Sequence, residues 1–157
     1  MRLTYFTDYS LRVLMYTAAA ADGRATIGEI ARAFDISENH LTKVVHFLGK
    51  EGLLLNVRGR GGGLRLALPA SEINVGAVVR KTESGDVPAE CFGENNHCSL
   101  TGRCRLEGVL AQAVEAFHAV LARYTLADLV KNRAVLAKVL FRDYVPVERP
   151  VRKRLAA

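Results

Sequence analysis

Residues 26–68 read TIGEIARAFDISENHLTKVVHFLGKEGLLLNVRGRGGGLRLAL, and this stretch decides the fold. Thr26 and Glu29 form a capping box, a threonine at the cap and a glutamate three residues later, which opens a short helix. A tight connection at 35–36 leads to a second helix over about 38–50. Two short helices joined by a turn of three or four residues are typical of a helix-turn-helix, whose second helix enters the major groove of DNA. The stretch therefore predicts this motif.

The apolar residues of both helices recur at the spacing of one buried helix face. Ser37 is the N-cap candidate of the second helix. The expected core positions are Ile27, Ile30, Ala31 and Phe34 in the first helix and Leu41, Val44, Val45 and Leu48 in the second.

The other face of the second helix is polar, and its side chains are the candidates for contacts in the groove. Two of them, Thr42 and Lys43, can also hold phosphate. The candidates are Asn39, His40, Thr42, Lys43 and His46.

A β-hairpin follows and is expected to form the wing of a winged helix. After Gly52, residues 53–57 read as one strand and residues 64–68 alternate as the return strand. Glycines in the loop between them let the backbone approach a phosphate closely, and Arg58 and Arg60 supply positive charge for the minor groove or the backbone. Arg65 is a further candidate. A glycine-rich nucleotide loop is the competing interpretation, but such a loop opens a helix, whereas this one opens a strand.

Residues 7–21 read as a helix that precedes this motif. Thr7 is its expected N-cap, and Asp8 then lies in the first turn, where a carboxylate favours the positive end of the helix dipole. Its expected buried face is Leu11, Leu14, Met15 and Ala18.

Three helices are expected after the wing. Ser71 is the N-cap candidate of a helix that ends at Glu83, and a last helix is expected over 126–144. Between them a long helix runs from near Cys104 to about Tyr124 and would measure about 30 Å. Because this exceeds what a small domain needs for its own core, a partner helix in a homodimer is the expected cover, with packing on its own domain as the alternative. Its apolar face is Leu106, Val109, Leu110, Ala113, Phe117 and Leu121.

Cys91, Cys98 and Cys104 are the three cysteines of the chain, and all lie in one loop rich in turn-forming residues. Soft thiolates favour iron–sulfur clusters, zinc or copper(I), so this loop is a candidate metal centre. His97 is a spare candidate ligand, although an exposed loop histidine is the favoured interpretation.

The 157-residue chain has a net charge of +6, placed at its two ends. Residues 1–68 carry a net charge of +3, and so does the tail 145–157, which we expect to lack fixed structure. The basic N-terminal part suits a polyanionic partner. We expect no signal peptide and no membrane span, hence a cytoplasmic protein with reduced thiols. No catalytic triad or pair of carboxylates can be placed, so an enzyme is not expected.

Several motifs together resemble the Rrf-type winged-helix iron–sulfur regulators, and the nitric-oxide-sensitive repressors among them most of all. The similarity covers roughly residues 1–130. The motifs are Thr7 to Arg12, Glu29-Ile30-Ala31, Ile36-Ser37, Leu41 to Val45, Gly59 to Gly63 and the three spaced cysteines.

The resemblance implies a homodimeric repressor that binds double-stranded operator DNA and carries an iron–sulfur cluster on Cys91, Cys98 and Cys104. It also implies that Asp8 of the other subunit is the fourth ligand. A 4Fe–4S cluster is favoured over a 2Fe–2S cluster, and nitrosylation by nitric oxide would displace Asp8 and release the DNA. Glu107 stands where the cluster-sensing relatives carry a histidine ligand, which weakens the histidine-ligated alternative.

The expected fold is mainly α with a small β-hairpin wing, that is, a winged helix-turn-helix domain plus a long dimerisation helix. Two rival functions stay open: a winged-helix regulator with a zinc or thiol sensor on the same cysteines, and an iron–sulfur electron carrier or enzyme. The expected divisions are a DNA-binding domain at 1–83, a cluster loop at 84–104, a dimerisation region at 105–144 and the basic tail.

Overall fold

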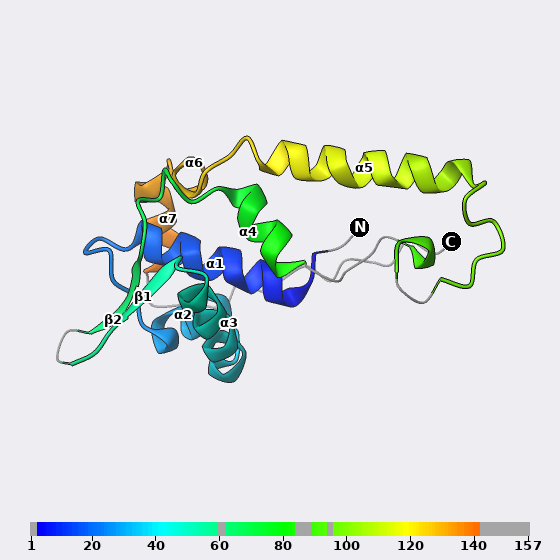
Figure 1. The fold of residues 1–157 in the computed structure, drawn as a ribbon. Helices are drawn as coiled ribbons and strands as arrows, with labels where there is room; N and C mark the ends of the chain where they lie inside the picture. The colour runs from blue at the N-terminus through cyan, green and yellow to red at the C-terminus, as the bar shows by residue number, and fades with distance from the viewer. Residues whose placement is uncertain (1–2, 60–61, 84–88, 94–95, 142–157) are drawn as a thin grey trace, which may run out of the picture.

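The computed structural model describes residues 3–59, 62–83, 89–93 and 96–141. It confirms a mainly helical chain with one antiparallel hairpin. Figure 1 shows α5 along one side of the molecule, α1 and α4 in the middle, and α2 and α3 on the other side. The elements are α1 (Tyr5–Ala19), α2 (Ile27–Phe34), α3 (Glu38–Lys50), β1 (Leu54–Val57), β2 (Gly63–Leu66), α4 (Val75–Thr82), the 3-10 turn η1 (Glu90–Phe92), α5 (Arg105–Leu121), α6 (Leu126–Leu129) and α7 (Arg133–Leu140).

Helix α1 begins earlier than predicted, because Thr4 and not Thr7 is its N-cap. The Thr4 hydroxyl accepts a hydrogen bond from the Thr7 backbone N–H at 3.2 Å. Thr7 is fully buried instead, and its hydroxyl donates to the Thr82 hydroxyl of α4 at 2.8 Å. Both threonines can act as an N-cap. Because the Thr7 side chain is used in the contact with Thr82 of α4, Thr4 caps the helix.

The buried face of α1 was predicted too narrowly. Of the four expected positions only Leu14 is fully buried, while Leu11, Met15 and Ala18 are half-buried at the edge of the core. The reason is that α1 contacts α3, α4, β2, α6 and α7, so it is covered on several sides. Its buried residues are Thr7, Ser10, Val13, Leu14, Tyr16, Thr17 and Ala19.

The helix-turn-helix agrees with prediction except in α2, where Ile30 and Ala31 are buried but Ile27 and Phe34 are only half-buried at the edge of the core. The Thr26–Glu29 capping box is present in both directions, and Asp35 makes the tight turn with φ of 54°. Helix α3 has the predicted bounds, and all four of its expected core residues are buried. Ser37 holds the N-cap position, but its side chain makes no capping hydrogen bond.

The hairpin is shorter than predicted, with four residues in each strand. Leu54 pairs with Leu66, and Val57 pairs with Gly63. Leu54 and Leu64 bury their side chains in the core, whereas the outer residues of β1 are exposed.

Helix α4 begins at Val75 with Asn74 as its cap, so the prediction of Ser71 was wrong. The Asn74 side-chain oxygen accepts from the Ala77 N–H at 3.0 Å, and its amide donates to the Ala122 carbonyl at 2.7 Å. Ile73 also accepts a backbone hydrogen bond from Leu126 at 2.8 Å. The segment before α4 therefore pairs with the chain after α5, which delays the start of the helix.

Helix α5 forms as predicted, with Cys104 at its N-cap position. The single helix expected over 126–144 is wrong, because the structure has α6 and α7 with a break between them. A second capping box, Thr125 with Asp128, opens α6, and Asn132 precedes α7. Residues 142–144 and the tail 145–157 lie outside the described part.

Among the helices in the described residues, none has the length and apolarity that a membrane crossing requires.

Candidate nucleic-acid interface and metal centre

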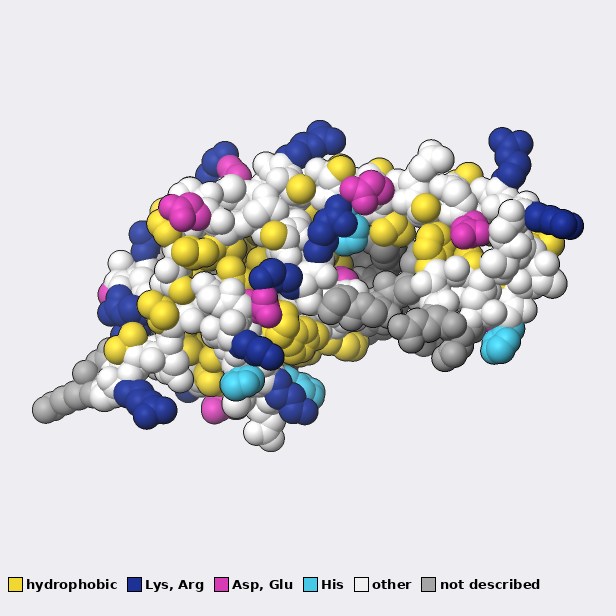
Figure 2. Space-filling view, in the orientation of Figure 1, with side chains coloured by type: hydrophobic (Ala, Val, Ile, Leu, Met, Phe, Trp, Pro, Cys, Tyr) yellow, Lys and Arg dark blue, Asp and Glu magenta, His cyan; other side chains and the backbone are white. Residues whose placement is uncertain are grey.

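The polar face of α3 is open to solvent. All five candidates for the groove, Asn39, His40, Thr42, Lys43 and His46, are exposed. Figure 2 shows histidine and basic side chains gathered over α3, on the side of the molecule away from α5. A basic, exposed helix after a helix-turn is suited to lie in a major groove.

Two of these side chains also have contacts within the chain. The Thr42 hydroxyl donates to the Glu38 carbonyl at 2.8 Å, so its proton is already used and its oxygen can only accept from a base or from water. The His40 ring lies 6.4 Å from the ring of Tyr9 in α1. Helix α1 therefore helps to position one candidate residue of α3.

Of the two arginines predicted to give the wing its positive charge, the described residues contain one. Arg58 is exposed at the end of β1, and Arg60 lies outside the described residues. Arg65 donates from Nη1 to the Asp22 carbonyl at 3.0 Å. Arg65 is therefore engaged with the loop between α1 and α2, whereas Arg58 extends into solvent.

The cysteine loop lies at the far end of α5, away from the helix-turn-helix (Figure 1). Cys91, Cys98 and Cys104 are half-buried free thiols. Asn96 holds the middle of the loop: its side-chain oxygen accepts from the Cys98 N–H at 3.0 Å, and its amide donates to the Thr101 hydroxyl at 2.8 Å. That hydroxyl donates in turn to the Cys98 carbonyl at 2.7 Å. Cys98 is thus placed by side chains of its own loop.

The surroundings of the Cys91 thiol disfavour its charged form. Burial raises the pKa of Cys91, and the charges of Glu107, Cys98 and Cys104 raise it further. Among the described residues, no group of three histidine, cysteine, aspartate or glutamate side chains lies close enough to hold a single metal ion. Three soft donors on one loop fit an iron–sulfur cluster, in which each thiolate binds its own iron rather than a common ion.

Asp8 is in the first turn of α1, as predicted, and among the described residues it forms no group of three possible metal ligands with the cysteines of its own chain. Both of its carboxylate oxygens face Arg12, at 2.9 Å from Nε and 2.8 Å from Nη2. The Arg12 guanidinium also lies 5.4 Å from the centre of the Phe34 ring in α2. Within one chain, Asp8 therefore forms an ion pair along α1.

Comparison with known proteins identifies the family. The model of the Rrf2 family, described as an iron-dependent transcriptional regulator, matches residues 3–132, most of the chain. The chain belongs to the Rrf2 family. It is 49% identical over 142 residues to the HTH-type transcriptional regulator NsrR of Bacillus subtilis strain 168, which covers 89% of this chain and 97% of that protein. The identity to NsrR of Geobacillus kaustophilus is 50%, with the same coverage.

Solved structures agree with this membership of the Rrf2 family. IscR of T. potens matches with a TM-score of 0.65 and 26% identity, over 84% of this chain and 88% of that one. The winged-helix fold and the expected family are thereby confirmed. The relatives are named as transcriptional regulators, so the chain is a DNA-binding regulator rather than an enzyme.

One connection in this Rrf2 protein was not predicted from sequence. Glu83 ends α4 just before the cysteine loop, and its Oε1 accepts from both the N–H and the hydroxyl of Thr4, at 2.8 and 2.9 Å. The start of the cysteine loop is therefore tied to the first turn of α1, which contains Asp8. The two partners are 79 residues apart in sequence, so no local signal marks this tie.

Proposed function

We propose that this chain is a homodimeric iron–sulfur transcriptional repressor that leaves its operator DNA when nitric oxide reacts with the cluster. The observation that carries the proposal is a loop with three free thiols in a chain about half identical to the NsrR regulators. Residues 1–83 would bind DNA, 84–104 would hold the cluster and 105–144 would form the dimer, with the tail 145–157 outside these functions.

The DNA would be bound by α3 and the wing together. Asn39, His40, Lys43 and His46 would face the major groove, with Thr42 as an acceptor. Arg58, joined by Arg60, would reach the adjacent minor groove or backbone. This division agrees with the exposure of the α3 residues and of Arg58, and Figure 1 shows α3 on the side of the molecule away from α5.

Cys91, Cys98 and Cys104 would hold the cluster, either 4Fe–4S or 2Fe–2S with the former favoured, and Asp8 of the partner subunit would complete it. Bound, the cluster supplies iron that can take nitric oxide as a ligand. A carboxylate oxygen is a harder donor than sulfur and matches iron less well, so it is the ligand most easily displaced. Asp8 would exchange its ion pair with Arg12 for the partner's cysteine loop.

Losing that ligand would break a tie between the two subunits. The carboxylate belongs to α1, which contacts α3 directly, and Glu83 of the same chain joins α1 to its own cysteine loop. A dimer reads two half-sites about 34–36 Å apart, so a small rotation of the two α3 helices spoils simultaneous binding.

The test is an anaerobic visible absorption spectrum during titration with nitric oxide, with binding to genomic DNA fragments followed in parallel. We expect a coloured protein whose chromophore bleaches as it leaves the DNA. A colourless, zinc-loaded protein that keeps its DNA in nitric oxide would instead support the zinc or thiol regulator on the same cysteines.

Asp8→Ala tests the fourth ligand. We expect the variant to lose cluster-dependent DNA binding, because three thiolates remain but the link between subunits does not. Arg12→Ala is the matched control, since it breaks the same ion pair and keeps the carboxylate. An Asp8→Ala protein with normal cluster-dependent DNA binding would contradict the assignment of Asp8 as the fourth ligand.

A further inference from the structure

The loop between α1 and α2 is joined to the wing through Asp22, Arg24 and Ala25. Ala25 and Leu64 exchange two backbone hydrogen bonds, at 3.0 and 2.6 Å, and so form an isolated antiparallel β-bridge between the loop and β2. This close approach needs Gly63, where an added Cβ would lie 2.6 Å from the Ala25 carbonyl oxygen. Gly63 is therefore needed for the packing of the wing against the loop, rather than for contact with a phosphate.

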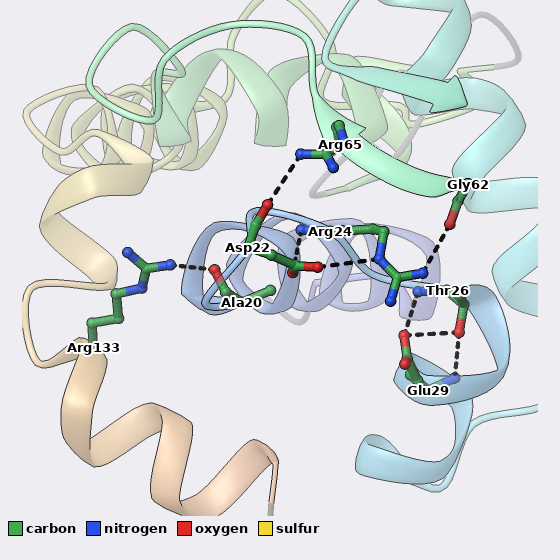
Figure 3. A network of polar contacts seen from close by, with 8 residues as sticks. All are labelled: Ala20, Asp22, Arg24, Thr26, Glu29, Gly62, Arg65 and Arg133. Atoms are coloured by element: carbon green, nitrogen blue, oxygen red, sulfur yellow. Dashed lines mark hydrogen bonds and ion pairs between the residues drawn. The ribbon is translucent and has the colours of Figure 1, made fainter. Parts of the chain in front are cut away.

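Arg24 extends this junction from the base of the wing toward its tip. Its Nη1 donates to the Gly62 carbonyl at 3.0 Å, while its Nε donates to the Asp22 carboxylate at 3.2 Å (Figure 3). The other Asp22 oxygen accepts from the Arg24 N–H at 3.1 Å. Asp22 thus holds the guanidinium in one orientation, and this bond pattern lowers the pKa of the Asp22 carboxyl.

The same loop is also held from the other side. Arg133 of α7 donates from Nε to the Ala19 carbonyl at 3.0 Å and from Nη2 to the Ala20 carbonyl, at the end of α1 (Figure 3). Arg65 of β2 donates to the Asp22 carbonyl. The loop therefore has a fixed position between α7 and the wing, which makes it a firm support for Arg24.

The hairpin needs such a support. A two-stranded hairpin is at best marginally stable alone. Here each strand has four residues, and only Leu54 and Leu64 are buried. Beyond this base, Leu55 and Val57 are 54% and 42% exposed, so packing does not hold the outer half. The bond from Arg24 to Gly62 reaches that outer half.

We propose that Arg24 is a positioning residue for DNA binding. Asp22 holds the Arg24 guanidinium, which in turn fixes the angle of the wing. At that angle, Arg58 contacts the DNA beside the groove that α3 occupies. This rests on the proposed function, which gives the wing its contact with DNA. Without Arg24 the wing has to be ordered during binding, and that ordering lowers the affinity.

The experiment measures the affinity of the full-length dimer for a genomic fragment that the wild type binds, at several salt concentrations. The variants are Arg24→Gln, Arg24→Lys, Arg58→Ala and the double variant Arg24→Gln/Arg58→Ala. Arg123→Gln is the matched control, because it removes one exposed positive charge at the end of α5. Thermal unfolding of each protein checks that the fold persists.

We expect Arg24→Gln to weaken binding about tenfold, as for loss of one charge-assisted hydrogen bond. Arg24→Lys should weaken binding as much, because an ammonium keeps the charge but lacks the fork that spans Asp22 and Gly62. In the Arg58→Ala background, Arg24→Gln should add little, since the wing has then lost the contact that Arg24 positions.

Three results would overturn the inference. If Arg24→Lys binds normally while Arg24→Gln lowers the salt slope by about one, Arg24 is itself a phosphate contact. If Arg58→Ala weakens binding and Arg24→Gln does not, the wing contacts DNA without this support. If Arg58→Ala has no effect, the wing assignment in the proposed function fails and the inference fails with it.

Discussion

Lys43 and Thr26 show two different tasks of single side chains in the helix-turn-helix. Lys43 is exposed on α3 and adds nothing to the core, whereas Thr26 closes the first turn of α2 with three hydrogen bonds shared with Glu29. A change at the first should alter binding without altering stability, and a change at the second should do the reverse.

Lys43→Ala should weaken DNA binding in a way that depends on salt. If Lys43 contacts phosphate, the slope of log affinity against log salt falls by about one unit, with the same loss on every sequence. If it reads a base, specificity relaxes by roughly 1–3 kcal/mol at one position. Titrations on operator and unrelated DNA separate the two, and unchanged binding to both would remove Lys43 from the interface.

Thr26→Ala should lower the free energy of unfolding by about 1 kcal/mol, because the cap of α2 loses its side-chain acceptor. Ser37→Ala is the control, since Ser37 holds the cap position of α3 without making the capping bond and should change little. Urea unfolding of the cluster-free protein measures both. An equal decrease in the free energy of unfolding of the two variants would show that the capping box does not stabilise α2.

At the scale of elements, the contact between α4 and α5 depends on a glycine. A Cβ on Gly76 of α4 would lie 2.7 Å from the Ala122 backbone nitrogen and 2.8 Å from its Cα. The backbones therefore approach closely where α5 ends, and Asn74 and Arg80 add polar links to Ala122 and Glu115. This junction sets the direction in which α5 leaves the body and hence where the cysteine loop lies.

Gly76→Ala should destabilise the protein by about 1–3 kcal/mol, because one of two backbones has to shift. Gly108→Ala is the matched control. Gly108 also lies in a helix, but an added Cβ there meets nothing within 4 Å. Alanine at this position should therefore stabilise the protein by up to about 1 kcal/mol. Opposite signs in chemical unfolding are the expected result. A neutral Gly76→Ala would show that the junction is loose.

At the scale of the molecule, α5 is incompletely covered by its own chain. Leu106 and Val109 are 61% and 59% exposed, and α5 has no buried residue among those described. Figure 2 shows apolar side chains along this helix. Since Asp8 and the cysteines form no group of three possible ligands among the described residues of one chain, the proposed dimer would both cover α5 and complete the metal centre.

Val109→Glu should weaken the dimer at least tenfold, because a carboxylate would be buried without a partner. Ala111→Glu adds the same charge two residues later, about 200° around the helix, and should leave the dimer intact. Sedimentation equilibrium measures both proteins. A Val109→Glu dimer as tight as the wild type would place the interface elsewhere.

Local signals made the helix-turn-helix and the cysteine loop predictable. Thr26 and Glu29 lie within one turn of helix, and α3 is buried on one side, so its apolar spacing reports its core residues directly. The three thiols lie in one short loop, which brings them together whatever the rest of the fold does. The sequence by itself therefore determined the second helix of the helix-turn-helix and the candidate metal ligands.

Tertiary structure alone decided the features whose partners are distant in sequence. Helix α1 is covered on several sides, so no single face could be read from its pattern, and its start depends on Thr82 of α4. Asn74 rather than Ser71 caps α4, because the carbonyl of Ile73, just before the helix, accepts a hydrogen bond from the Leu126 N–H. Arg24 finds Gly62 across 38 residues. Such contacts form only once the chain is packed, because the backbone carbonyls and hydroxyls that they satisfy are brought within reach by the fold.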